Sequence, residues 1–172
     1  MILLGIETSC DETAAAVVRD GHQVLANVIA SQAAKHAPYG GVVPELAARE
    51  HLQAIDPIVR QAVEQAAITI DAVDAVAVTA TPGLLPALLV GVAYAKGLAA
   101  SLERPLIAVD HLQAHVFGAL IDHPEHVRNP ATYPLLALIV SGGHTLLVLV
   151  ADDGACRTIG QTLDDAAGEA FD

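Results

Sequence analysis

Basic side chains are scarce in this sequence of 172 residues. It has 8 lysines and arginines against 20 aspartates and glutamates, which gives a formal net charge of −12 at pH 7. A surface of this charge repels polyanions, because nucleic-acid binding depends largely on basic side chains that neutralise phosphates. A nucleic-acid substrate would therefore need basic surface from a further segment or from a partner.

Long apolar runs and export signals are also lacking. The longest apolar stretch, 84–95, is interrupted by Pro86 and Gly91 and is followed by Lys96. It falls short of the roughly 20 apolar residues that a membrane span requires. The start of the chain, 1–7, has no basic segment before its apolar residues, so it does not resemble a signal peptide. The sequence therefore predicts no membrane partner.

Cysteine is rare as well. Cys10 and Cys156 are the 2 cysteines and lie far apart in the sequence. Without an export signal, both are expected to be free thiols in a reducing cytosol. We therefore expect a cytoplasmic protein.

Hydrophobic residues, in contrast, make up 53% of the chain. The mean hydropathy of +0.50 suits a buried sheet covered by helices. The length suffices for one well-packed core, or for one lobe and the start of another.

The apolar patterns predict one series of elements that then begins to repeat. Asp20-Gly21 between two apolar runs predicts a hairpin, Pro44 suits the first turn of a helix, and Pro57 is expected to kink or divide that helix. Thr162 is expected to cap a last helix that begins near Asp164. The expected strands are 2–6, 13–19, 23–31, 75–79, 106–109, 135–140, 145–150 and 156–161, the expected helices are 44–67, 83–100 and 111–121, and the expected linker is 123–133.

This order, β-β-β-α-β-α-β-α followed by β-β-β-α, indicates an α/β protein. We interpret 1–128 as a ribonuclease-H-like lobe and 129–172 as the truncated start of a second one. Two such lobes in series form the actin/Hsp70-like ATPase superfold, whose ligands lie between the lobes near strand ends.

The first polar motif, Glu7–Thr13, follows the first expected strand. Ser9 and neighbouring backbone N–H groups suit a phosphate, while Asp11 and Glu12 suit Mg²⁺ held through water or the orientation of a nucleophile. An ordinary polar hairpin has the same composition.

The second motif is a histidine pair. His111 and His115 stand at i and i+4, on one face of the expected helix, which suits two ligands of one Zn²⁺ or Fe²⁺ ion. Position 112 is Leu, so the glutamate that serves as general base in H-E-x-x-H metallopeptidases is absent. Two exposed histidines without a metal have the same spacing, and Asp110 suits a helix cap better than a third ligand.

The third motif, 140–145, turns between two strands of the second lobe. Gly142 and Gly143 allow positive φ angles and a close approach of the backbone to a phosphate, and His144 adds a switchable charge. The last motif, 164–172, places Asp165, Glu169 and Asp172 on one helical stripe, although acids in a first helical turn also complement the helix dipole, which would account for Asp164 and Asp165. Its small residues 166–168 suggest the close approach of a helix or a ligand.

These motifs, with Tyr39–Ala47 and Pro82-Gly83-Leu84, occur in the order seen in one family, which the whole chain resembles. This is the tRNA N6-adenosine threonylcarbamoyltransferase family, TsaD in bacteria, formerly described as glycoproteases. The resemblance implies transfer of threonylcarbamoyl from its adenylate to the N6 amine of the adenosine next to the anticodon, in tRNAs that read codons beginning with A.

The resemblance also implies site residues, ligands and partners. One divalent metal, Fe²⁺ or Zn²⁺, would be held by His111 and His115, and Asp11 with Glu12 would be catalytic. Threonylcarbamoyl-adenylate, or ATP with Mg²⁺, would be the nucleotide ligand. Implied partners are tRNA, the TsaB paralogue and the TsaE ATPase. The implied nucleotide contacts are Ser9, Ile139, Val140, Ser141, Gly142, Gly143, His144 and Asp172.

Two departures from the family matter. Asp110 stands where a histidine is often found, and the sequence ends at Asp172, inside a motif. The family's third metal ligand, an aspartate, and its adenine pocket would lie beyond this point. We therefore expect this chain alone to bind metal and nucleotide weakly, to be inactive, and to self-associate through exposed apolar surface.

Three alternatives remain open at this stage. A small-molecule phosphotransferase of the same superfold would not need the histidine pair. A metallopeptidase would need the general base that Leu112 replaces. A scaffold without catalysis would dimerise through the apolar helix 83–100.

Overall fold

The computed structural model describes residues 1–171. The chain forms two compact units, Met1–His111 and Leu112–Asp172. The lobe boundary that the sequence suggests, between 128 and 129, stays a prediction.

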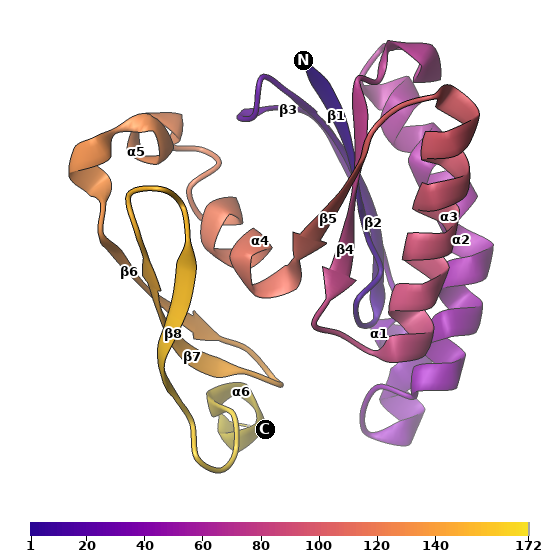
Figure 1. Ribbon diagram of the computed structural model, residues 1–172. Helices are drawn as coiled ribbons and strands as arrows, with labels where there is room; N and C mark the ends of the chain where they lie inside the picture. Colours follow the sequence, from indigo (N-terminus) through magenta and orange to yellow (C-terminus); the bar gives the residue numbers. More distant parts are fainter. Residues whose placement is uncertain (172) are drawn as a thin grey trace. The chain divides into compact units, whose positions relative to one another are not determined.

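The first unit is built on a five-stranded mixed sheet with the order β3-β2-β1-β4-β5 (Figure 1). β1 pairs antiparallel with β2, and β2 with β3, whereas the pairs β1–β4 and β4–β5 are parallel. This confirms the expected layout of a ribonuclease-H-like lobe. The strands are β1 (Ile2–Glu7), β2 (Glu12–Arg19), β3 (Gln23–Ser31), β4 (Ala75–Thr81) and β5 (Leu106–Asp110).

The hairpin between β2 and β3 turns as predicted. Asp20 has φ 54° and Gly21 has φ 75°. Two successive residues with positive φ form a tight turn that the His22 N–H closes by donating to the Arg19 carbonyl, and an Asp-Gly pair favours such a turn.

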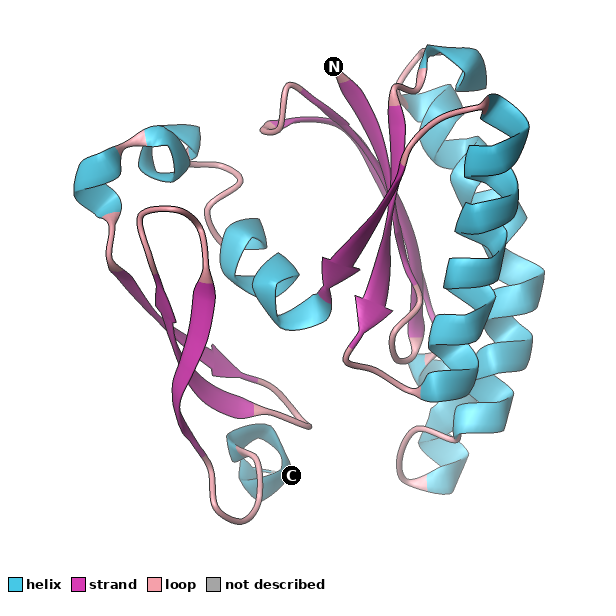
Figure 2. Ribbon diagram, viewed as in Figure 1, coloured by secondary structure: helices cyan, strands magenta, loops and turns pink. Residues whose placement is uncertain are grey.

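Two long helices, α2 (Pro44–Gln65) and α3 (Leu85–Leu102), lie side by side on one face of this sheet (Figures 1 and 2). Pro57 does not divide α2, contrary to one of the two expected outcomes. Pro57 is exposed, and so is Gln53, whose carbonyl loses its helical partner where water can replace it. Both helices bury an apolar stripe against the sheet, made of Ala47, Ile55, Ile58, Val59 and Ala62 in α2 and Ala87, Leu88, Gly91, Ala95 and Ala99 in α3.

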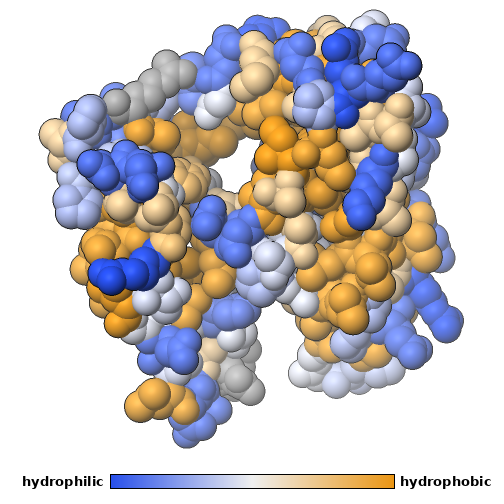
Figure 3. Space-filling view, viewed as in Figure 1, coloured by the Kyte–Doolittle hydropathy of each residue, from blue (hydrophilic) through white to orange (hydrophobic). Residues whose placement is uncertain are grey.

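α3 is the one helix of the described residues with the length and composition to cross a membrane, with a hydropathy of 1.6 over Leu85–Leu102. A helix that covers the core of a globular protein passes the same test. In the structure, its small residues face the sheet and α2. Leu85 and Leu89 stay 69% and 59% exposed, and Figure 3 shows hydrophobic surface in this part of the first unit.

Several short helical elements were not predicted from the sequence. α1 and two 3-10 turns lie in the first unit where no element was expected: α1 (Ala33–His36), η1 (Ala37–Tyr39) and η2 (Ile70–Ala72). α4 (His111–Gly118) begins where predicted but ends three residues before Ile121. Elements of three or four residues carry too little periodicity to be read from a pattern.

The second unit contains a three-stranded antiparallel sheet, β6-β7-β8. Its strands have the predicted bounds: β6 (Leu135–Val140), β7 (Thr145–Val150) and β8 (Cys156–Gln161). The expected linker 123–133 instead contains α5 (Pro124–Arg128) and the 3-10 turn η3 (Pro130–Thr132). The core of this unit consists of Val116, Ile139, Leu146, Val148 and Val150.

The last helix, α6 (Ala167–Phe171), begins later than predicted. α6 begins at Ala167, so Thr162 lies too far upstream to be its N-cap, and its hydroxyl instead donates to the Asp165 carbonyl at 2.8 Å. The Ala167 N–H instead donates to Oγ1 of Thr145 at 2.7 Å. The expected cap at Thr162 and the start near Asp164 are therefore wrong.

Candidate functional site

The carboxyl ends of the parallel strands β1, β4 and β5 meet at one edge of the first sheet, because parallel neighbours run in the same direction. β1 ends at Glu7, β4 at Thr81 and β5 at Asp110. Thr81 pairs with Asp110 in the register, and His111 follows directly as the first residue of α4. Residues far apart in the sequence therefore share one edge.

Glu7 is at the centre of this edge. Its Oε1 accepts a hydrogen bond from the Ser9 backbone N–H, and its Oε2 accepts one from the Thr79 hydroxyl. Nδ1 of His111 lies 3.4 Å from Oε2 of Glu7 and 3.2 Å from Oγ of Ser9. Four residues from three strand ends thus form one polar cluster, which we call the Glu7 cluster: Glu7, Ser9, Thr79 and His111.

The cluster keeps Glu7 ionised. Burial on its own raises the pKa of this carboxyl, but the hydrogen bonds from His111, Ser9 and Thr79 outweigh burial and lower the pKa to about 2. The hydrogen bond to Glu7 raises the pKa of His111 in return, against the opposing effect of burial. A carboxylate that contacts Nδ1 is the usual support of a histidine that binds a metal through Nε2.

Glu7 begins the motif Glu7–Thr13, but the motif alone predicts no role for it. Its position does predict that it has polar partners, because an acidic residue at the end of a buried strand needs hydrogen bonds to offset the cost of burial. Which partners it has depends on the pairing of distant strands. Ser9, in contrast, was predicted as a site residue, and it lies in the cluster.

The turn after Glu7 is packed tightly against the start of α3. The Ser9 carbonyl accepts from the Leu84 N–H at 2.8 Å. A Cβ atom added to Gly83 would lie 2.7 Å from Cβ and O of Ser9. Similarly, a Cβ on Gly91 would lie 2.3 Å from Oγ1 of Thr8. The two glycines therefore let α3 approach the turn closely enough to fix it.

Asp11 and Glu12, the predicted catalytic pair, lie on this turn between β1 and β2, where Asp11 is half-buried and Glu12 is exposed. The neighbouring thiol of Cys10 has its pKa raised to about 11 by partial burial and by its hydrogen bond with Asp11. Both carboxylates are therefore accessible at the same end of the sheet as the Glu7 cluster.

The predicted histidine pair lies on one helix, α4, as expected. His111 belongs to the Glu7 cluster, and His115 is exposed. Within the second unit, His115 lines a pocket of about 380 Å³ together with the predicted residues Ile139, Val140 and Ser141. The structure therefore brings His115 together with three of the predicted nucleotide contacts.

The turn at 141–145 closes on itself. The Ser141 N–H donates to the His144 carbonyl at 2.8 Å, and the His144 N–H donates to Oγ of Ser141 at 3.0 Å. Gly142 and Gly143 are exposed, and nothing lies within 4 Å of a Cβ added to either. Neither has a positive φ, so the turn does not use the backbone freedom that glycine allows, and the backbone of both residues is left uncovered.

The small residues of the last motif approach this same turn. The Gly168 N–H donates to the Ser141 carbonyl at 3.1 Å. A Cβ on Gly168 would lie 2.7 Å from the backbone of Ser141 and Gly142. The close approach expected near Gly168 is thus made by the Ser141 turn. Asp172 lies outside the described residues, so the predicted stripe with Asp165 is not tested.

A third group of possible metal ligands lies on and beside α5. One ligand atom each from His123, Glu125 and His126 fall within 4.8 Å of one another. All three side chains are exposed, and His123 Nδ1 lies 3.3 Å from Oε1 of Glu125. A hydrogen bond between the exposed side chains of His123 and Glu125 explains this arrangement without a metal.

Two solved structures share the fold. YeaZ from Pseudomonas aeruginosa superposes with a TM-score of 0.57 at 22% identity, over 94% of this chain and 68% of YeaZ. Component A of the (R)-2-hydroxyglutaryl-CoA dehydratase of Acidaminococcus fermentans has a TM-score of 0.53 at 12% identity, over 99% and 51%. These similarities confirm the predicted fold class, the actin/Hsp70-like ATPase fold.

Sequence comparisons identify the family. Residues 23–172 match the model of TsaD, tRNA N6-adenosine threonylcarbamoyltransferase. A protein of that name from Syntrophobacter fumaroxidans is 55% identical over 172 residues, which are 100% of this chain and 49% of the relative. One from Clostridium perfringens is 55% identical over 171 residues, 99% of this chain and 49% of the relative. The chain thus spans about half the length of these relatives. It belongs to the tRNA N6-adenosine threonylcarbamoyltransferase family.

Proposed function

We propose that this chain contributes to an enzyme that transfers threonylcarbamoyl from threonylcarbamoyl-adenylate to the N6 amine of the adenosine next to the anticodon. The tRNA substrates would be those that read codons beginning with A. The observation that carries the proposal is the Glu7 cluster, which collects Glu7, Ser9, Thr79 and His111 at the strand ends. In α/β folds these strand ends are where ligands bind.

The proposed reaction is an acyl transfer. The N6 nitrogen attacks the carbonyl carbon of the mixed anhydride, a C–N bond forms, and the C–O bond to the phosphate of AMP breaks. AMP leaves with the bonding electron pair, and the nitrogen loses one proton. Asp11, accessible on the turn after β1, is the carboxylate that we assign to receive this proton, with Glu12 beside it.

His111 and His115 are the two residues that would hold the divalent metal, Fe²⁺ or Zn²⁺. The contact of Glu7 with Nδ1 of His111 fits this role, since a carboxylate at that nitrogen directs Nε2 to the metal. When bound, the metal would polarise the acyl oxygen of the substrate.

The second unit would bind the nucleotide. Backbone N–H groups of the uncovered Gly142-Gly143 segment suit a phosphate or acyl oxygen. Ile139, Val140 and Ser141 line a pocket next to this segment. We therefore keep residues 139–144 as the proposed contacts of threonylcarbamoyl-adenylate, or of ATP with Mg²⁺.

The net charge of this chain is −12, and such a charge repels the phosphates of tRNA. Binding of a tRNA substrate therefore requires basic side chains that this chain does not supply. We propose that the remainder of a protein of the relatives' length, or the TsaB paralogue and the TsaE ATPase as partners, supplies that surface. This chain without them would show no measurable transfer.

The experiment uses a chimera in which residues 1–172 replace the matching half of the Syntrophobacter relative. Purified chimera is incubated with threonylcarbamoyl-adenylate, a tRNA transcript and the two partners, and transfer is measured with labelled threonine. We expect transfer by the chimera and at least a tenfold loss in His111→Ala, the typical scale for a metal-site residue. His126→Ala is the matched control, since it removes a histidine of the exposed group on α5 and should leave transfer intact.

Two results would contradict the proposal. A folded chimera without transfer, beside an active parent relative, would refute the function. ATP-dependent phosphorylation of a small molecule that survives His111→Ala would favour the phosphotransferase. The residue after His111 is Leu112, where H-E-x-x-H metallopeptidases have their general base, and this argues against a metallopeptidase.

A further inference from the structure

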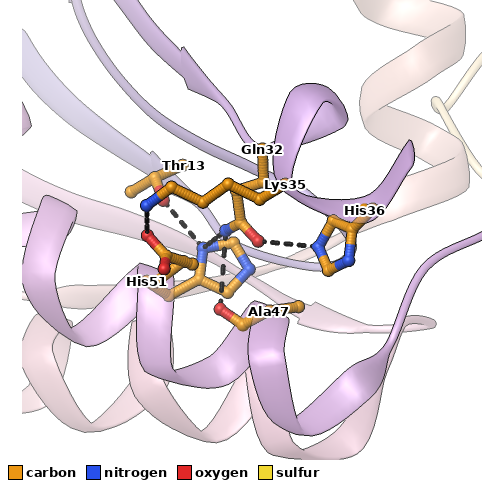
Figure 4. Close-up of polar contacts among 7 residues, drawn as sticks. Thr13, Gln32, Lys35, His36, Ala47 and His51 are labelled. Atoms are coloured by element: carbon orange, nitrogen blue, oxygen red, sulfur yellow. Dashed lines mark hydrogen bonds and ion pairs between the residues drawn. The ribbon is translucent and has the colours of Figure 1, made fainter. Parts of the chain in front are cut away.

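A buried polar network lies in the first unit between β2, α1 and α2 (Figure 4). Its side chains are nearly inaccessible: Thr13 and His51 are 0% exposed, His36 is 3% and Gln32 is 5%. Beside it, Lys35 of α1 pairs with Glu50 of α2. Polar groups this deeply buried destabilise a fold unless their hydrogen bonds are made, so the direction of each bond can be worked out.

The Gln32 side chain has one permitted orientation. One of its amide atoms faces the Ala47 carbonyl at 3.4 Å. A carbonyl can only accept, so this amide atom must be Nε2, which donates. Oε1 then faces Nε2 of His36 at 3.0 Å and accepts from it.

His36 is therefore neutral with its proton on Nε2. Its other nitrogen, Nδ1, lies 3.2 Å from the backbone N–H of Val43, which can only donate. Nδ1 must accept that bond and carries no proton.

The same reasoning determines the tautomer of His51. Its Nε2 lies 3.0 Å from the Cys10 carbonyl, so Nε2 donates. Its Nδ1 lies 3.3 Å from Nε2 of Gln32, which can only donate, so Nδ1 carries no proton; the Thr13 hydroxyl, at 2.8 Å, shares the one lone pair of Nδ1 with Gln32. Burial also lowers the pKa of His51, which agrees with a neutral ring.

The hydrogen bonds thus run in one direction. They pass from the Val43 N–H through His36, Gln32 and His51 to the Cys10 carbonyl. The Gln32 backbone N–H also donates to the next carbonyl, that of Asp11, at 2.9 Å. Two successive carbonyls of the β1–β2 turn are thus held, one by Gln32 at the N-cap of α1 and one by His51 of α2.

We propose that His36, Gln32 and His51 are positioning residues, a directional relay that holds the turn bearing Asp11 and Glu12 in the geometry required for transfer. The relay also gives a role to the segment Tyr39–Ala47, whose Val43 N–H and Ala47 carbonyl fix the direction of the bonds. The catalytic part of this inference rests on the proposed function. The directions of the hydrogen bonds do not depend on that function.

The first test measures the tautomers in the unmodified chain by ¹⁵N–¹H correlation spectroscopy of the imidazoles at neutral pH. The relay requires an Nε2–H tautomer with an unprotonated Nδ1 for both His36 and His51. A proton on Nδ1 of either ring would overturn it. No substitution is needed, so a failure to fold cannot obscure the result.

The second test uses Gln32→Glu with Gln53→Glu as the matched control, because Gln53 is an exposed glutamine of α2. A carboxylate at position 32 cannot donate to Nδ1 of His51 or to the Ala47 carbonyl. In the chimera we expect kcat to fall by about tenfold to a hundredfold with KM nearly unchanged, as for a displaced catalytic group. Gln53→Glu should match the parent, and a folded Gln32→Glu chimera with the parent's kcat would overturn the positioning role.

A third measurement separates this inference from the proposed function. Cys10 is an exposed cysteine on the held turn, and Cys156 is half-buried in the other unit, so alkylation of Cys156 serves as an internal reference. In the Gln32→Glu variant the turn should be less firmly held, so the raised pKa of Cys10 should return toward its ordinary value. More of the thiol is then ionised at neutral pH, and the rate of its alkylation should rise. If no chimera transfers threonylcarbamoyl, faster alkylation still supports the relay, and an unchanged rate overturns it.

Discussion

Oε2 of Glu7 lies 3.4 Å from Nδ1 of His111, although 104 positions separate the two residues in the sequence. The contact joins the end of β1 to the start of α4. It orients the one predicted metal ligand that lies in the first unit, and it makes Glu7 a partner of the proposed metal site.

Replacing Glu7 with Gln tests this relationship. Glutamine keeps the size of the side chain but removes the negative charge that supports the imidazole. We expect affinity for Zn²⁺ or Co²⁺ to fall by about tenfold to a hundredfold, the usual cost of losing such a support. Titration of the purified chimera against a chromophoric chelator measures this loss. Glu45→Gln, on the exposed start of α2, is the control, and equal metal affinity in both variants would contradict the assignment.

Two glycines of α3 should respond to alanine in opposite directions. A Cβ on Gly91 would lie 2.3 Å from Oγ1 of Thr8, which donates to the Ala87 carbonyl, so Gly91→Ala overpacks the turn. We expect a loss of about 1 to 3 kcal/mol in the free energy of unfolding. Gly97 has nothing within 4 Å of an added Cβ, so Gly97→Ala should gain up to about 1 kcal/mol from helix propensity. Urea denaturation of both variants measures the two changes in the free energy of unfolding. Equal changes would show that α3 does not approach Thr8 this closely.

His51 should make stability depend on pH. Burial lowers its pKa in the folded chain below the ordinary 6.5, to which it returns on unfolding. The unfolded state therefore binds more protons, and this contribution to stability is present above about pH 6.5 and falls as the pH decreases below it. Free energies of unfolding at pH 7.5 and 5.5 measure the effect. His51→Gln should show a smaller difference between the two pH values, and an unchanged difference would mean that His51 is not its source.

Local patterns predicted much of the fold. Short apolar runs bounded by turn residues predicted the strands of both sheets, and Asp20-Gly21 predicted the hairpin, because these features depend on near neighbours. The start of α6 was missed because the N–H of its first residue, Ala167, is held by the hydroxyl of Thr145 on β7, a distant contact that a local motif does not show.

The candidate site was predicted less completely, for a physical reason. The spacing of His111 and His115 is local and can be read directly. The grouping of Glu7, Thr79 and His111 depends on which strands pair in parallel, and no local pattern encodes that. The buried His36–Gln32–His51 relay was missed for the same reason, since its parts come from separate elements joined only by packing.

The account's central claim is threonylcarbamoyl transfer that depends on the histidine at the end of β5. The most direct measurement is the amount of N6-threonylcarbamoyladenosine, by mass spectrometry of nucleosides from tRNA treated with the chimera or with its His111→Ala variant. We predict the modified nucleoside with the chimera and at most about a tenth as much with the variant. Equal amounts from the two proteins, or none from a folded chimera when the parent relative is active, would contradict the account.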